Sequence, residues 1–151
     1  MTKVFQTIVS EGNGNCMQAV IASLFDKPLN QVPNFIEFGD QWFSKMRGYY
    51  SIYGYEPVFS RDMTKYCGVS LKEIAKYDGG VDGYFYGSVP SQTFEDIIHA
   101  VVVDTDLNIV HDPNPNQKAL NLKSDNVMNI LTVGNWYLDE NGNFIKVEDN
   151  A

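Results

Sequence analysis

The chain has 151 residues, of which 44% are hydrophobic, and this length and apolar content fit one folded domain with a substantial core. Its formal net charge is −8, with 11 basic against 19 acidic residues, which argues against unaided binding to nucleic acid or to an anionic membrane surface. No apolar run approaches the ~20 residues of a membrane span, and M-T-K-V-F-Q-T at the start lacks a signal-peptide core, so we expect a cytoplasmic protein.

The first predicted element is a helix that begins at Cys16. Gly12 and Gly14 loosen its approach, Pro28 closes its far end, and its apolar residues follow one buried stripe: Cys16, Met17, Val20, Ile21 and Leu24. A cysteine reacts as its thiolate, and the unpaired N–H groups at a helix N-terminus favour that anion. Cys16 is therefore a candidate nucleophile, and a small buried core residue is the structural alternative.

The next predicted element is an amphipathic helix over residues 40–50. Asp40 is its expected N-cap, and its apolar residues have helical spacing: Trp42, Phe43, Met46 and Tyr49. We expect this helix to pack against the first one as part of the core.

Shorter elements are predicted over the rest of the chain. They are strands over 55–59, 83–89, 130–133, 137–139 and 144–147, and a helix over 70–77. Pro57 directs the first of these strands to a sheet edge. Ser70 is the expected N-cap of the short helix, with Glu73 as its capping-box partner.

A β-hairpin is predicted after the polar loop 91–98. His99 opens its first arm, and His111 and Asp112 end the second, across the turn D-T-D-L-N. Because side chains alternate faces along a strand, an even number of connecting residues places Asp112 on the face of His99, and an odd number places His111 there. We choose Asp112, since a carboxylate would orient the imidazole and stabilise the imidazolium. His111 would then point away as a partly exposed structural residue.

Other cysteine and histidine chemistry is not expected. In a reducing cytosol Cys16 and Cys67 stay thiols, and we place Cys67 half-buried at a turn. A zinc site built from Cys16, Cys67, His99 and His111 is disfavoured, because none of them has C-x₂-C or H-x₃-H spacing. The sequence has no cofactor motif, and it leaves the oligomeric state open.

Three stretches of the sequence carry a family resemblance. They are V-F-Q-T near the start, G-N-C-M-Q-A-V-I-A-S-L-F-D-K-P-L-N-Q-V-P-N-F around Cys16, and H-A-V-V-V…V-H-D-P-N-P from His99 onward. On these motifs the chain resembles short phage- and bacteria-encoded proteins with a papain-like (peptidase C39-like) cysteine-protease fold. The resemblance implies one α+β domain over 1–151, with an N-terminal nucleophile helix packed on an antiparallel sheet.

The resemblance also implies roles for individual residues. Cys16 would be the nucleophile, His99 the general base and then acid, and Asp112 the orienting group. Papain-like enzymes use a glutamine ahead of the cysteine as an oxyanion-hole donor, and Gln6 is the candidate here. Asn13 and Asn15 lie nearer to Cys16 and are the alternatives.

The expected function is that of a cysteine peptidase or a related thiol acyl-transfer hydrolase. It would act on a peptide, isopeptide or amide bond of a protein or peptide substrate, and transferase or deamidase chemistry could use the same site. The resemblance further implies a phage-encoded protein that works in the host cytoplasm. The alternative is a catalytically inactive papain-like scaffold that binds a protein or inhibits a host factor, which a surface patch of aromatic residues within 42–59 would favour.

Overall fold

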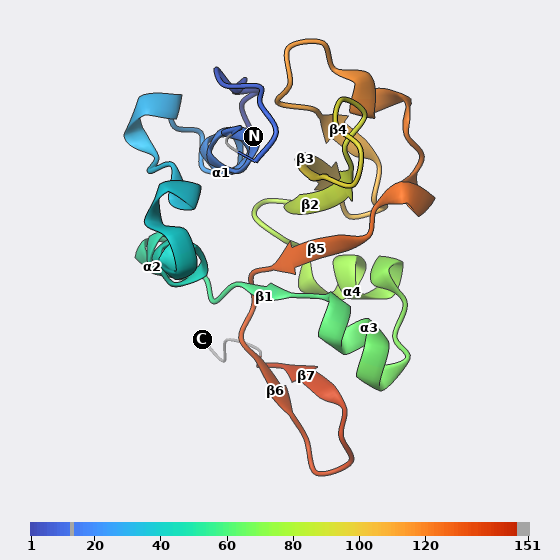
Figure 1. The fold of residues 1–151 in the computed structure, drawn as a ribbon. Coiled ribbons are helices and arrows are strands. Elements are labelled where there is room, and N and C mark those ends of the chain that lie inside the picture. The colour runs from blue at the N-terminus through green and yellow to red at the C-terminus, as the bar shows by residue number, and fades with distance from the viewer. Residues whose placement is uncertain (13, 148–151) are drawn as a thin grey trace.

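The computed structural model of the chain describes residues 1–12 and 14–147. They form an α+β fold around a five-stranded antiparallel sheet with the strand order β1-β5-β2-β3-β4 (Figure 1). The strands are β1 (Val58–Phe59), β2 (Tyr84–Pro90), β3 (Ile98–Asp104), β4 (Ile109–His111) and β5 (Asn129–Thr132). A separate antiparallel hairpin joins β6 (Trp136–Leu138) to β7 (Phe144–Lys146).

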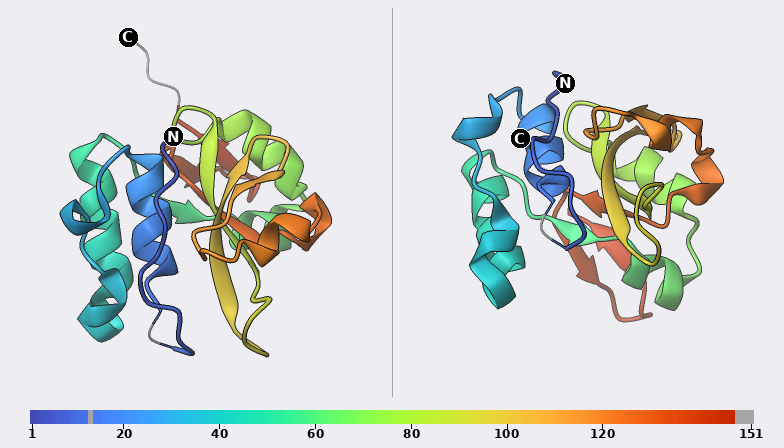
Figure 2. Two further views of the ribbon diagram at one scale, coloured as in Figure 1. Left: turned by 90° about the horizontal axis from the view of Figure 1, so that it is seen from above. Right: turned by 45° about the horizontal axis from the view of Figure 1, so that its top comes forward.

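Helices cover both faces of the sheet (Figure 2). The α-helices are α1 (Cys16–Leu24), α2 (Trp42–Ile52), α3 (Arg61–Cys67) and α4 (Leu71–Asp78). Short 3₁₀ helices connect other elements: η1 (Leu29–Gln31), η2 (Phe35–Gln41), η3 (Lys118–Asn121) and η4 (Ser124–Asn126). None of the helices in the described part of the chain is both long and apolar enough to cross a bilayer.

Strand β3 is buried on both of its faces, and this explains why residues 100–103 form a continuous apolar run. Ala100 and Val102 pack into the cluster that α1 and α2 form with one face of the sheet. Val101 and Val103 pack into the cluster that α3 and α4 form with the other face. A strand buried on both faces has no polar side to show, so its apolar residues do not alternate with polar ones.

Helix α1 is more deeply buried than one apolar stripe predicts. All of its residues from Ala19 to Leu24 are buried, including Ser23, whose hydroxyl donates to the Ala19 carbonyl at 2.8 Å. The helix lies between the sheet and α2, and the first residues of the chain run beside it (Figure 2). A helix that is apolar all round is a core helix, so the N-terminus of α1 is held on a rigid element.

Helix α2 starts two residues later than predicted, and Asp40 does not cap it. The preceding residues already form the 3₁₀ segment η2, which is interrupted by Gly39 at φ +57°. Gln41 is the N-cap of α2, without a side-chain cap hydrogen bond. The predicted packing of this region is as expected, because Trp42, Phe43 and Met46 belong to or pack against the α1 cluster. Within residues 42–59 the large apolar residues that are exposed are Ile52 and Tyr53.

The shorter elements follow the sequence closely. Strand β1 covers only the last two residues of the strand predicted over 55–59. It lies directly after Pro57 and forms an edge of the sheet, and that edge position was predicted. Ser70 caps α4 by accepting the backbone N–H of Glu73 at 3.2 Å, as predicted. Helix α3 was not predicted. It ends at Cys67, and Gly68 follows in the left-handed conformation.

Candidate active site

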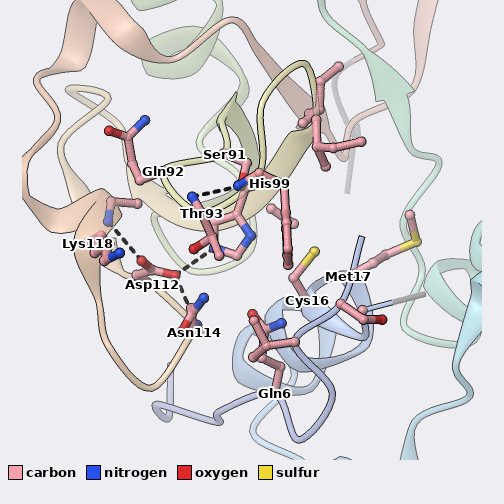
Figure 3. Close-up of a pocket in the computed structure, with 18 of the residues that line it drawn as sticks. Gln6, Cys16, Met17, Ser91, Gln92, Thr93, His99, Asp112, Asn114 and Lys118 are labelled. Atoms are coloured by element: carbon pink, nitrogen blue, oxygen red, sulfur yellow. Dashed lines mark hydrogen bonds and ion pairs between the residues drawn. The ribbon is translucent and has the colours of Figure 1, made fainter. Parts of the chain in front are cut away.

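A pocket lies where the N-terminus of α1 meets the start of β3 (Figure 3). Its lining includes all four residues that the sequence analysis selected: Gln6, Cys16, His99 and Asp112. Gln6 comes from residues 1–12, which precede α1 and are called the N-terminal segment. The other three come from α1, from β3 and from the chain directly after β4. The fold thus brings together the selected residues from four separate segments.

Cys16 is the first residue of α1 and is half-buried at the rim of the pocket. The helix has no acidic residue in its first turn, and its N-cap residue makes no side-chain cap hydrogen bond. In Figure 3 Cys16 lies on the side of the His99 ring that faces away from Asp112, and the thiol and the imidazole form a side-chain hydrogen bond. The free N–H groups of the first helical turn and the imidazole therefore both act on the sulfur.

The β3–β4 hairpin places Asp112 on the face of His99 through a five-residue connection and a one-residue β-bulge. Val103 pairs with Ile109, so five residues connect the strands, and this odd number alone would place His111 on the face of His99. The register then shifts by one residue, because Val102 pairs with His111 and Val110 is the extra residue of a β-bulge. The bulge restores the even parity, so Asp112 shares the face of His99.

His99 and Asp112 form a close pair in the pocket wall. The Nε2 atom of His99 lies 2.6 Å from Oδ1 of Asp112, and the two side chains are 12% and 2% exposed. Two backbone N–H groups also donate to the carboxylate at 2.9 Å, from Asn114 to Oδ1 and from Ala119 to Oδ2. These contacts fix the ring through Nε2, which leaves Nδ1 as the nitrogen available to Cys16 and to a substrate.

The electrostatics of the three groups favour their ionised forms. Burial raises the pKa of Cys16, but the hydrogen bond and charge of His99, with backbone donors at Ala100 and Met17, lower it below its ordinary 9.0. Burial lowers the pKa of His99, whereas Asp112 and Cys16 raise it, to about 9. Burial raises the pKa of Asp112, but the hydrogen bond from His99 and the two backbone donors outweigh it and lower it. The imidazolium therefore stabilises the thiolate on one side and the carboxylate on the other, and each anion stabilises the imidazolium.

The loop after Asp112 is held by a series of Asx turns that the sequence analysis missed. Asp112 accepts the backbone N–H of Asn114 at 2.9 Å, and Asn114 accepts that of Asn116 at 3.1 Å. The sequence signal is D-P-N-P-N, in which acceptor side chains alternate with prolines that restrict the backbone. This loop is what returns the N–H of Ala119 to the carboxylate.

Gln6 is buried beside Cys16 and directs its amide toward the pocket (Figure 3). Its Nε2 donates to the Ile8 carbonyl at 2.9 Å, and its backbone N–H donates to the Pro113 carbonyl at 2.9 Å. Its Oε1 has no hydrogen-bond partner among the described residues. An amide nitrogen carries two N–H groups, so one remains for a group bound in the pocket.

Asn15 has a different task from the one considered for it. Its Oδ1 accepts the backbone N–H groups of Thr7 and Ile8 at 3.0 and 2.9 Å. Its Nδ2 donates to Thr7 Oγ1 at 3.1 Å and to Gln18 Oε1 at 3.3 Å. The amide is fully engaged in fastening the N-terminal segment to α1, so Asn15 has no donor left for the pocket. Asn13 lies outside the described residues.

The sequence led us to expect a partly exposed His111, and this prediction is wrong, because His111 is only 1% exposed. Its Nε2 lies 2.7 Å from the Val4 carbonyl, and the ring of Phe5 meets it edge-on with centroids 5.0 Å apart. The N-terminal segment covers it, and no hairpin pattern could have shown that contact. His111 is outside the lining of the pocket.

Cys67 also lies away from the pocket. It is half-buried at the end of α3, and its Sγ donates to the Gly142 carbonyl at 3.1 Å. Both cysteines are free thiols. Within residues 1–12 and 14–147, no group of three or more His, Cys, Asp or Glu side chains is arranged to hold a metal ion.

Comparisons with models of known protein families, with curated protein sequences and with solved structures found no match to this chain.

Proposed function

We propose that the chain is a cysteine peptidase or a related thiol acyl-transfer hydrolase with a papain-like fold and a Cys16–His99–Asp112 triad. The observation that carries this proposal is that Asp112 contacts His99 and His99 in turn contacts Cys16. Asp112 holds Nε2 of His99 at 2.6 Å, and the rest of the imidazole faces the sulfur at the N-terminus of α1 (Figure 3). The arrangement of nucleophile, base and orienting group is the one that acyl transfer requires.

The proposed reaction begins with attack of the Cys16 thiolate on a carbonyl carbon. The C–S bond forms as the carbonyl π electrons move to oxygen, which gives a tetrahedral oxyanion. The imidazolium of His99 then gives its Nδ1 proton to the leaving nitrogen as the C–N bond breaks. His99 next takes a proton from water, whose oxygen attacks the thioester, and the acid and the thiolate are released.

Two donors would stabilise the oxyanion in this reaction. One is the backbone N–H of Cys16, which has no intrahelical acceptor because it opens α1. The other is the second amide N–H of Gln6, whose first N–H is fixed on the Ile8 carbonyl. Removal of one such donor lowers kcat by about 10²–10³-fold, so Gln6→Ala tests the assignment.

The size of the pocket favours an extended chain as the substrate. Its volume is about 190 Å³, which is below the roughly 300–1,000 Å³ of sites that enclose drug-sized ligands. Apolar side chains from three segments line it, including Val9, Met17 and Phe94. We therefore infer a protein or peptide segment that passes through the pocket, with the scissile peptide, isopeptide or amide bond at Cys16.

Acylation by an activated ester tests the proposal without knowledge of the natural substrate. The protein is mixed with benzyloxycarbonyl-glycine p-nitrophenyl ester, release of nitrophenol is followed, and the acylated residue is located by mass spectrometry. We expect the acyl group on Cys16, its turnover by water, and no acylation in Cys16→Ala. An unmodified Cys16 would contradict the proposal and would favour an inactive scaffold that binds a protein.

The same assay has a matched control within the chain. Cys67 is a second free, half-buried thiol that lies outside the pocket. Cys67→Ala should leave both acylation and turnover unchanged. Equal acylation of the two cysteines would mean that the ester reports ordinary thiol chemistry instead of a catalytic site.

A further inference from the structure

The N-terminal segment is fastened to the chain around Asp112 by contacts on both sides of that residue. On one side, His111 Nε2 lies 2.7 Å from the Val4 carbonyl. On the other, the backbone N–H of Gln6 donates to the Pro113 carbonyl at 2.9 Å. The N-terminal segment therefore runs beside residues 111–113, which carry the carboxylate of the proposed triad.

His111 is placed to control this attachment. A backbone carbonyl can only accept, so Nε2 of His111 is the donor and the neutral ring carries its proton there. Its Nδ1 is buried and has no hydrogen-bond partner among the described residues. The ring of Phe5 packs edge-on against His111 at an interplanar angle of 85°. Val4 and Phe5 directly precede Gln6, so their positions determine where the Gln6 amide lies.

We propose that His111 is a positioning residue that sets the location of the Gln6 amide in the oxyanion hole through its contacts with Val4 and Phe5. This inference rests on the proposed acyl-transfer function and adds a residue that does not touch the substrate. The bulge at Val110 gives each of two adjacent residues a separate task. Asp112 faces His99, and His111 faces the segment that carries Gln6.

This role predicts that two reactions of Cys16 respond differently. Alkylation by iodoacetamide is a displacement at carbon and forms no oxyanion, so it depends on the thiolate and not on Gln6. Acylation by benzyloxycarbonyl-glycine p-nitrophenyl ester passes through an oxyanion and depends on both. A positioning residue for Gln6 should therefore affect acylation alone, whereas general disruption of the site should affect both reactions.

The test uses two substitutions with a matched control. His111→Leu removes the donor to the Val4 carbonyl. Phe5→Ala removes the ring that packs against His111, and because Phe5 is 37% exposed, this variant spares the core. Phe38→Ala is the control, because Phe38 has similar exposure, at 43%, and does not line the pocket. His111→Gln retains a side-chain N–H that can donate to the Val4 carbonyl and should restore acylation.

We expect His111→Leu to lower the acylation rate by about 10²-fold, as for loss of an oxyanion donor, with iodoacetamide alkylation unchanged. Phe5→Ala should lower acylation in the same sense by less, and Phe38→Ala should not change it. Combining His111→Leu with Gln6→Ala should cost no more than Gln6→Ala alone, because both act on one donor.

Two results would overturn the inference. One is unchanged acylation in both His111→Leu and Phe5→Ala. The other is an equal fall of acylation and alkylation in the two variants, which would indicate loss of the whole site. Failure of the proposed function has a separate signature, since wild-type Cys16 would then not be acylated at all, and the inference would fall with it.

Discussion

The chain holds two cysteines and two histidines, and they occupy contrasting places. Cys16 begins a helix and faces an imidazole in a pocket, whereas Cys67 ends a helix and donates its S–H to the Gly142 carbonyl. His99 contacts a carboxylate at the pocket, whereas His111 is enclosed in the protein against a carbonyl. Residue type is the same within each pair, and surroundings are not.

The comparison teaches where reactivity comes from in this fold. A helix N-terminus offers free N–H groups to an anion, and a helix C-terminus offers carbonyls. An imidazole beside a carboxylate gains a proton more readily, as the pKa of about 9 for His99 indicates. Burial instead lowers the pKa of His111, and this outweighs the hydrogen bond to the Val4 carbonyl, which raises it. The chemistry should therefore belong to Cys16 and His99 alone.

Substitution of the cysteines by alanine should give the largest difference in ester turnover. Cys16→Ala should lower turnover of the p-nitrophenyl ester by about 10³-fold or more, because no nucleophile remains. Cys67→Ala should leave turnover unchanged. Ester hydrolysis by both variants, normalised to folded protein by circular dichroism, measures the contrast, and equal activities would remove it.

Substitution of a buried carboxylate sharpens the contrast further. Asp112→Asn should lower turnover by about 10²-fold or more, because the amide neither stabilises the imidazolium nor accepts from all its present donors. Asp78→Asn is the matched control. Asp78 is also buried, but its carboxylate accepts N–H groups at Gly134 and Trp136, remote from the pocket.

Both aspartate variants should be less stable, by about 1–3 kcal/mol each, because each turns a satisfied backbone donor toward an amide NH₂. Only Asp112→Asn should lose turnover. Urea unfolding gives the stabilities and ester hydrolysis gives the turnover. Comparable loss of activity in Asp78→Asn would mean that stability, and not the triad, limits the reaction.

The pH profile of turnover tests the charged pair at an intermediate level. Turnover should rise as Cys16 ionises, at a pH below its ordinary 9.0, because the pKa of this thiol is lowered. With an amide substrate such as a p-nitroanilide, whose leaving nitrogen must be protonated, it should fall again near pH 9, where His99 loses its proton. A bell-shaped profile is the expected result. A rise that continues above pH 9 would show that the imidazolium is not required.

The smallest effect is expected far from the site. Ser70→Ala removes the N-cap of α4, whose hydroxyl accepts the Glu73 N–H at 3.2 Å. Loss of such a cap costs about 1 kcal/mol. The midpoint of urea unfolding should fall while ester turnover stays constant, and a change in turnover would link α4 to the pocket.

Local signals in the sequence were enough for several elements. Ser70 caps α4 and Pro57 precedes an edge strand, because capping and proline geometry depend on a few neighbouring residues. The helix at Cys16 also starts where predicted, since its apolar spacing is strong. The α+β class with an antiparallel sheet follows from these elements together.

Contacts between distant segments were not accessible in the same way. The bulge at Val110 depends on packing across the hairpin, so parity alone left Asp112 and His111 open. The burial of His111 depends on Val4, more than a hundred residues away. Asn15 serves the N-terminal segment through hydrogen bonds that no local pattern reveals. Sequence reasoning found the candidate chemistry, and the tertiary contacts gave each residue its place.

The central claim is that His99 activates Cys16. Its most direct test is the rate of iodoacetamide modification of Cys16 as a function of pH, in the native protein and in His99→Ala, with Cys67 as the internal reference. Because the pKa of Cys16 is lowered, we expect it to be alkylated faster than Cys67 at pH values below its ordinary 9.0, and this advantage to be lost in His99→Ala. Equal, slow alkylation of Cys16 in both proteins would contradict the claim and turn the search to binding partners.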